Sequence, residues 1–171
     1  MLLLMTSYVN AADVCKDPDL GKFLKLDYQA FDQSPPVGGW RELENKGKEK
    51  QILALLDNYR KCKKGLKPDE NATIWFHSGQ AAAELGQYDD AIKRMQKSYD
   101  KTLEAEWHWT DFVDGSIAFL KHDLDGLKKA RAHLAQIESD HPYVHELDKL
   151  IDCFDSKYKD VPQCAQKKHA K

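Results

Sequence analysis

Apolar positions repeat with a helical period along most of the chain. Between Ile52 and Tyr59, apolar side chains lie three and four residues apart, as they do on one face of a helix. No segment shows the sustained alternation of apolar and polar residues that is typical of a half-buried strand. The same helical spacing continues to Tyr158 and is interrupted at four places: Leu85-Gly86, Leu103, His122-Asp123 and Asp140-His141-Pro142. We therefore expect an all-α fold.

The sequence also predicts a helix at each end of this region. Asp17-Pro18 has the form of an N-cap followed by proline in the first turn, and Ser34-Pro35-Pro36 stops the run that follows. This predicts an N-terminal helix over residues 19–31. An apolar stripe predicts a last long helix over residues 143–154, and both helices are expected to cap the ends of the fold.

Comparing the chain with itself reveals a repeat of 36 residues. Gly79 and Gly115 are separated by this period, and so are Tyr88-Asp89 and Leu124-Asp125. The first copy resembles the tetratricopeptide repeat (TPR), a helix–turn–helix unit of about 34 residues. The TPR motif positions are occupied, at the spacing of that family, by Trp75, Gly79, Gly86, Tyr88, Ala91 and Met95.

The resemblance is confined to one clear unit, at about residues 72–105, and two degenerate ones at about 108–137 and 40–64. Ser98 stands where the motif usually has alanine, and Leu103 stands where proline often ends the unit. The resemblance implies an α-α solenoid of about 7–8 antiparallel helices, with residues 12–171 forming one domain. Its signature residues pack between helices, so they do not themselves specify a function.

The TPR resemblance also implies a concave face, lined by the first helix of each unit. His77 would lie at its edge, and large aromatic side chains on such a face often anchor peptide partners. The alternative is that so short an array curls and buries these aromatics against the N-terminal helix. The residues expected to line the groove are Thr73, Phe76, His77, Gln80, Ala83, Glu84, Trp109, Phe112, Ser116, Phe119 and Leu120.

The N-terminus and the cysteines suggest an oxidising compartment. We expect residues 1–11 to be the remaining part of a secretory signal peptide, cut before Ala12. The four cysteines form no C-x-x-C pair, and three disulfide pairings are possible. Proximity along the chain favours Cys153–Cys164, which would pin a tail of residues 153–171, and Cys15–Cys62. Reduced thiols in a cytoplasmic protein are the alternative, if the N-terminal segment is not a signal.

Charge and motifs exclude several function classes. The 171 residues carry 26 basic and 28 acidic side chains, a net charge of −2, so there is no basic footprint for nucleic acid. No apolar run is long enough to span a membrane. No phosphate-binding glycine motif occurs, and we expect no cofactor.

The histidines are the remaining candidates for chemistry. His141 and His145 lie four residues apart and could share a face for zinc, but no H-E-x-x-H motif occurs. His77, Ser78 and Asp111 could be drawn as a triad, yet Ser78 occupies a packing position of the repeat. We expect neither a metal site nor catalysis.

The sequence thus predicts a periplasmic or secreted, non-enzymatic protein-interaction module with a protein or peptide partner. Two alternatives stay open. One is a small exported hydrolase or metal-dependent enzyme that uses the histidine and acidic clusters. The other is a purely structural accessory subunit.

Overall fold

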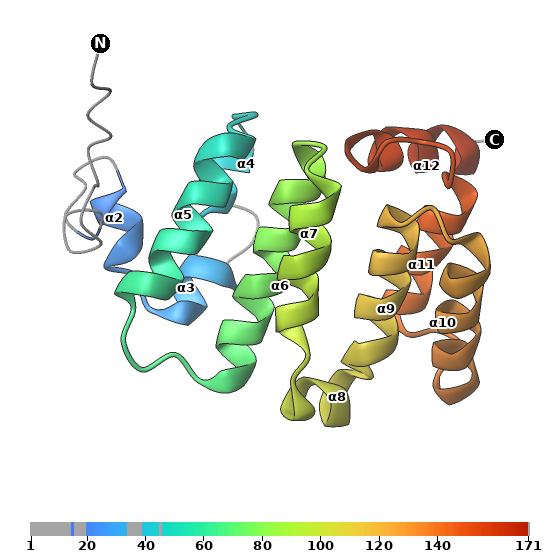
Figure 1. Ribbon diagram of the computed structural model, residues 1–171, viewed down its shortest axis with the longest axis horizontal. Helices are drawn as coiled ribbons and strands as arrows, with labels where there is room; N and C mark the ends of the chain where they lie inside the picture. The colour runs from blue at the N-terminus through green and yellow to red at the C-terminus, as the bar shows by residue number, and fades with distance from the viewer. Residues whose placement is uncertain (1–14, 16–19, 34–38, 45, 171) are drawn as a thin grey trace, which may run out of the picture. The chain divides into compact units, whose positions relative to one another are not determined.

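The computed structural model describes Cys15 and residues 20–33, 39–44 and 46–170, and every regular element in this part of the chain is helical (Figure 1). The predicted all-α class is confirmed. Seven of the described α-helices have eight or more residues, and four are shorter. The short ones raise the total above the seven or eight helices expected. The predicted signal segment, residues 1–11, lies outside the described residues.

The chain divides into two compact units, Met1–Leu66 and Lys67–Lys171, whereas the sequence predicts one domain from residue 12 onward. The first unit contains α2 (Gly21–Leu24), α3 (Tyr28–Asp32), α4 (Arg41–Glu44) and α5 (Glu49–Cys62). Its core includes Leu55, which is fully buried, and the ring of Phe31, which stacks on Tyr59 at a centroid distance of 3.6 Å.

The predicted continuous N-terminal helix is in fact two short helices. Gly21–Leu24 ends at Lys25, and a new helix begins after Asp27. The carboxylate of Asp27 accepts a hydrogen bond from the backbone N–H of Ala30 at 2.8 Å, which is an N-cap. A side chain that caps a new helix at this point competes with continuation of the old one, and this explains the break.

The second unit is built mainly from antiparallel helix pairs. The first pair is α6 (Pro68–Glu84) with α7 (Tyr88–Met95), which continues into the 3-10 turn η1 (Gln96–Ser98). The second pair is α9 (Trp109–Leu120) with α10 (Leu124–Ile137), and α11 (Pro142–Asp152) packs against both of these helices. The chain ends in η2 (Tyr158–Asp160) and α12 (Val161–His169), and α12 lies across one end of this bundle (Figure 1).

A helix break predicted at Leu103 is wrong. Leu103 lies inside α8 (Lys101–Trp107), which joins the two helix pairs. The breaks fall on either side of it. Asp100 caps the start by accepting hydrogen bonds from the N–H groups of Thr102 and Leu103, and His108 ends the helix in the left-handed conformation, with φ of 50°.

The 36-residue period of the sequence reappears in the backbone of the two inter-helix turns. In the first turn, the N–H groups of Leu85, Gly86 and Gln87 donate to the carbonyls four, three and five residues earlier, respectively. In the second turn, the N–H groups of Lys121, His122 and Asp123 form the same three hydrogen bonds. The middle residue is left-handed in both, with φ of 73° at Gly86 and 58° at His122. Glycine adopts this conformation without strain, whereas His122 does not.

The two glycines of the repeat face different neighbours. A Cβ atom added to Gly79 would lie 2.6 Å from Met95 Cγ and 3.1 Å from the carbonyl oxygen of Ala91, both on α7. Position 79 therefore has no room for a side chain, because α6 and α7 cross closely there, as predicted. Ala91, on the facing helix, is fully buried. A Cβ added to Gly115 would instead meet the side chain of Leu147 on α11, at 2.5 Å. The sequence-equivalent position thus serves a contact to a third helix.

Each unit contains one disulfide bridge. Cys15 pairs with Cys62, and Cys153 pairs with Cys164, which is the pairing favoured by proximity along the chain. The second bridge joins the end of α11 to α12 and spans 11 residues. In the chain-entropy model, a bridge that closes a loop of this length stabilises the folded state by roughly 3 kcal/mol.

Candidate functional site

The aromatic residues predicted to line a groove lie together, but they are buried. Phe76, Trp109 and Phe112 are 2%, 4% and 8% exposed, and the ring of Phe76 lies 4.9 Å from Trp109 and 5.0 Å from Phe112. Tyr143, on α11, stacks on Phe112 at 4.1 Å. In the described chain these side chains therefore form a core between α6, α9 and α11. They are buried, as in the alternative to an open groove, but the contact that covers Phe112 comes from α11 and was not predicted.

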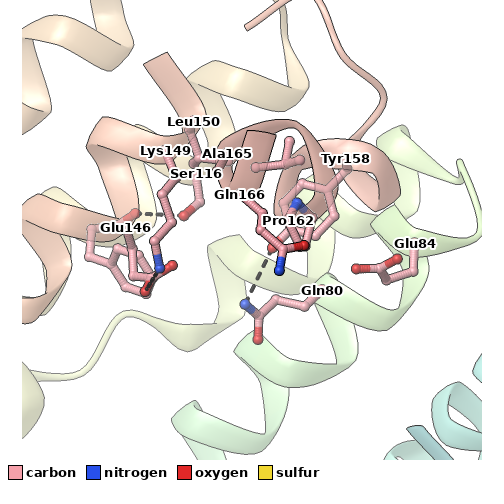
Figure 2. A pocket seen from close by; sticks show the side chains of 12 residues that line it. Gln80, Glu84, Ser116, Glu146, Lys149, Leu150, Tyr158, Pro162, Ala165 and Gln166 are labelled. Carbon is pink, nitrogen blue, oxygen red and sulfur yellow. Dashed lines mark hydrogen bonds and ion pairs between the residues drawn. The ribbon is translucent and has the colours of Figure 1, made fainter. Parts of the chain in front are cut away.

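The other predicted groove residues are buried or half-buried. Phe119 and Ser116 are buried, and the Ser116 hydroxyl donates to the carbonyl of Phe112 within its own helix, at 2.8 Å. Thr73 is half-buried and likewise donates to its helix backbone, at the carbonyl of Asp69. His77 is half-buried on α6. Gln80, Glu84, Phe112 and Ser116 of the predicted set line one cavity together (Figure 2).

This cavity, which we call the α12 pocket, has a volume of about 460 Å³ and lies between α6, α9 and α11 on one side and the C-terminal segment on the other (Figure 2). Its apolar lining comes from Phe112, Leu150, Val161, Pro162 and Ala165, and its polar lining from Gln80, Glu84, Ser116, Glu146, Lys149, Tyr158 and Gln166. A mostly pre-formed cleft with an apolar floor and a few polar groups is the usual form of a ligand site.

Tyr158 joins the C-terminal segment to the first helix pair through two hydrogen bonds. Its hydroxyl accepts a hydrogen bond from Gln80 Nε2 at 3.3 Å, and its backbone N–H donates to the hydroxyl of Tyr88 at 3.1 Å. Its ring also packs on Phe119, at a centroid distance of 6.0 Å. Tyr88, a signature residue of the repeat, therefore fixes a segment that lies 70 residues further along the chain.

The pocket carries charge of both signs. Lys149 donates to Glu146 at 2.7 Å, one turn apart on α11, and Glu84 lies across from them on α6 (Figure 2). The pKa of the Tyr158 phenol is raised to about 12, chiefly by burial. The hydrogen bond from Gln80 opposes this shift, and the carboxylates of Glu84 and Glu146 add to it. Tyr158 therefore stays neutral near pH 7 and can donate a hydrogen bond into the pocket.

Sequence reasoning missed the contribution of α11 and of the tail. Tyr143, Glu146, Lys149 and Leu150 lie on one helical face at intervals of three and four residues, and this periodicity could have identified them. No sequence pattern indicates the contacts of Tyr158, because its partners Gln80 and Tyr88 lie 78 and 70 residues away along the chain.

The side chains considered above for a triad and for a histidine pair have other contacts in the structure. Asp111 contacts His133 on α10, with 2.7 Å between Oδ2 and Nδ1. Ser78 is fully buried and accepts a hydrogen bond from Arg94.

His141 is the N-cap of α11, where its Nδ1 accepts from the N–H of Tyr143, and His145 contacts Asp140. Among the residues that the structure describes, no group of three or more potential metal ligands lies close enough together to hold an ion.

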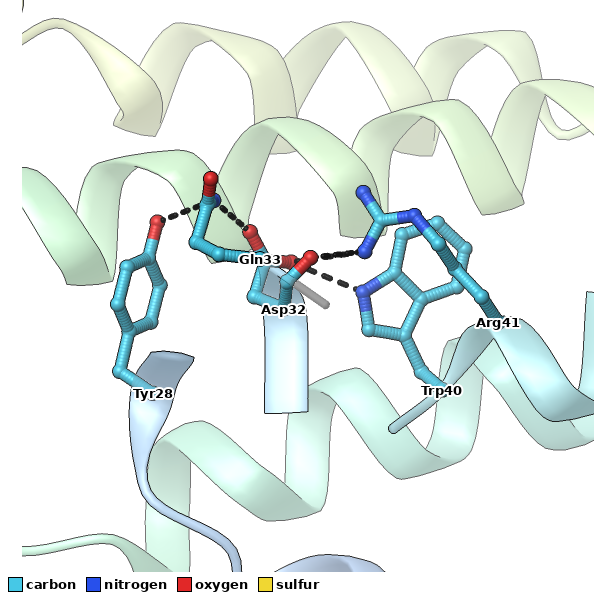
Figure 3. Close-up of polar contacts among 5 residues, drawn as sticks. All are labelled: Tyr28, Asp32, Gln33, Trp40 and Arg41. Carbon is cyan, nitrogen blue, oxygen red and sulfur yellow. Dashed lines mark hydrogen bonds and ion pairs between the residues drawn. The ribbon is translucent and has the colours of Figure 1, made fainter. Parts of the chain in front are cut away.

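A buried carboxylate organises the first unit. Asp32 is 1% exposed, and its two oxygens accept hydrogen bonds from Trp40 Nε1 at 2.8 Å and from Gln33 Nε2 at 2.5 Å (Figure 3). Arg41 stacks over the Trp40 ring and donates to the backbone carbonyl of Asp32. Because these groups satisfy one another, the cluster ties α3 to α4, and we assign it a structural role.

No helix in the described part of the chain is both long and apolar enough to cross a membrane. Comparison with protein-family models, with curated proteins and with solved structures found no match to this chain.

Proposed function

We propose that this protein is a non-enzymatic, TPR-like interaction module that binds a peptide or protein partner at the α12 pocket, in an oxidising compartment outside the cytoplasm. The observation that carries this proposal is the pocket itself. It lies on the first helices of the two repeat-like pairs, where the TPR resemblance implies binding, and it combines an apolar floor with hydrogen-bonding groups around its mouth.

The lining suits a peptide more than a small polar metabolite. Phe112 and Leu150 offer apolar surface for one partner side chain, while Gln80, Gln166 and the Tyr158 hydroxyl offer donors and acceptors to a peptide backbone. Because the aromatic core beneath the pocket is already packed, little ordering of the protein would accompany binding.

The compartment is proposed from the disulfides. Both bridges are formed in the structure, and structural disulfides persist in oxidising environments such as the periplasm or the extracellular space. The signal-peptide prediction for residues 1–11 would explain how the chain reaches such a compartment.

Peptide display on the oxidised full-length protein tests the proposal. Peptides enriched from a random library should bind with micromolar or better affinity by isothermal titration calorimetry. Gln166→Trp, at an exposed position of the pocket mouth, should weaken binding at least about tenfold. Lys129→Trp, at an exposed position on α10 outside this pocket, should leave the affinity unchanged. Equal binding to both variants, or a library that yields no binder, would refute the proposal.

Burial of the aromatic cluster favours a second candidate, a structural accessory subunit whose groove is filled by its own chain. Under that function, Trp109→Ala would lower the stability of the fold, and display would yield no peptide that competes at the α12 pocket. The same experiment therefore separates the two functions.

A further inference from the structure

We propose that the Cys153–Cys164 disulfide is a redox latch on the α12 pocket, so that the oxidised protein has a complete binding site and the reduced protein does not. This inference rests on the proposed function, because it concerns the regulation of the same site. It follows from where the bridge lies, from what the bridged segment contributes to the pocket, and from how little else fixes α12.

The bridged segment forms a large part of the pocket. Of the twelve residues that line it, five lie in the C-terminal segment: Tyr158, Val161, Pro162, Ala165 and Gln166. Four of these five belong to α12, so the departure of this helix would convert the pocket into an open surface on α6, α9 and α11. Phe112 and Leu150, which are 8% exposed each, would then be more accessible to solvent.

Two parts of this segment are held in different ways. The η2 turn is fixed through Tyr158, by hydrogen bonds with Gln80 and Tyr88 and by ring contact with Phe119. Phe154, just before it, packs between Phe119 and His122. These contacts do not involve the bridge, and we expect them to persist when it is reduced.

The α12 helix itself has few attachments of this kind. It has nine residues, and its buried apolar side chains are Val161 and Ala165. No side chain caps its N-terminus. Isolated helices of this length are unstable in water. Lys168 donates to the carbonyl of Asp152, but at an exposed position where such a bond contributes little. The covalent link at Cys164 is therefore the main attachment of α12.

The chemistry of release needs an external dithiol of the thioredoxin type. Cys153 is 2% exposed whereas Cys164 is half-buried, so Sγ of Cys164 is the accessible target. A thiolate of the reductant attacks this sulfur, the S–S bond breaks, and Cys153 leaves as a thiolate. The second thiol of the reductant then displaces Cys164. Two electrons and two protons pass to the protein, which gains two thiols, and the reductant leaves as a disulfide.

The other bridge provides a matched control. Cys15–Cys62 lies in the first unit and contributes no residue to the pocket. Removal of that bridge should leave α12 in place. A difference between the two bridges therefore reports on the latch and not on the loss of disulfides in general.

Hydrogen–deuterium exchange of the full chain tests the latch without any partner. In the double variant Cys153→Ser/Cys164→Ser, amides of residues 161–169 should exchange faster by up to about a hundredfold, the change in closure equilibrium expected for an 11-residue loop. Amides of α6, α9 and α11 should keep their protection. The variant Cys15→Ser/Cys62→Ser should show neither change in the second unit, and dithiothreitol followed by reoxidation should make the effect reversible in the native chain.

Unchanged exchange over residues 161–169 would overturn the proposal, because packing alone would then hold α12. Loss of protection throughout α6, α9 and α11 would also overturn it, since the bridge would then be a general staple of the fold. A peptide selected on the oxidised protein should bind Cys153→Ser/Cys164→Ser at least about tenfold more weakly than Cys15→Ser/Cys62→Ser. If display yields no peptide, the proposed function fails, while the exchange result still decides whether α12 is released.

Discussion

The two glycines of the repeat, Gly79 and Gly115, provide a stringent test of the packing described above, because alanine should destabilise the fold at the first and have little effect at the second. A Cβ at position 79 would lie 2.6 Å from Met95 Cγ, 3.1 Å from the carbonyl oxygen of Ala91 and 3.2 Å from the backbone nitrogen of Met95. Two of these three atoms belong to the α7 backbone and can move only if α6 and α7 separate. Overpacking of this kind costs about 3 kcal/mol.

Alanine has a higher helix propensity than glycine by about 1 kcal/mol, which offsets part of this cost. Gly79→Ala should therefore lower the free energy of unfolding by about 2 kcal/mol. At Gly115, all three close atoms belong to the Leu147 side chain, which can rotate away. The overpacking there should cost about 1 kcal/mol and be cancelled by the gain in propensity, so that Gly115→Ala is nearly neutral.

Urea unfolding of the oxidised protein, followed by far-ultraviolet circular dichroism, measures both changes. With a denaturant dependence of about 2 kcal/mol per molar, the midpoint of Gly79→Ala should fall about 1 M below that of Gly115→Ala. Equal midpoints for the two variants, or a larger loss for Gly115→Ala, would show that α6 and α7 do not cross at Gly79 as described.

Three further changes test separate features. Gly86→Ala, at φ of 73°, should lower stability by about 1 kcal/mol in thermal unfolding, and an unchanged melting temperature would exclude a left-handed residue there. Asp27→Ala removes the N-cap of α3 and should lower the free energy of unfolding by about 1 kcal/mol in urea, whereas Asp27→Asn should keep most of the stabilisation that the cap provides. The pKa of Tyr158 is higher in the folded state than in the unfolded state, so the stability gained from its neutral phenol is complete below about pH 10 and is lost towards pH 12. In unfolding experiments between these pH values, the free energy of unfolding of Tyr158→Phe should therefore fall by about 2 kcal/mol less than that of the native chain.

The parts of the fold that the sequence predicts are those whose contacts are local. The α6–α7 pair can be predicted because Gly79 on α6 meets Ala91 on α7 across a single turn, in which Gly86 takes the left-handed conformation. The Cys153–Cys164 pairing is readable because the two residues are 11 apart. The start of α8 at Asp100 and the break at Asp27 carry ordinary capping signals, but the helical spacing of apolar residues on both sides obscures them.

The site was predictable only in part. Gln80 and Glu84 follow from the TPR resemblance, and the aromatic residues beneath them were found as a set. Whether those aromatics face solvent depends on Tyr143 covering Phe112, a contact between helices that no repeat pattern specifies. The C-terminal wall was not predictable, since Tyr158 meets Gln80 across 78 residues of sequence.

That long separation has a consequence for how the protein is made. Contacts across a single turn close quickly, whereas a contact across 70 or more residues closes a much longer loop and forms late. During synthesis the two hairpins emerge and can pair while η2 and α12 are still being added. The side of the α12 pocket that residues 158–166 form is added afterwards, so a nascent chain, or one shortened before residue 158, would have both hairpins but an incomplete pocket.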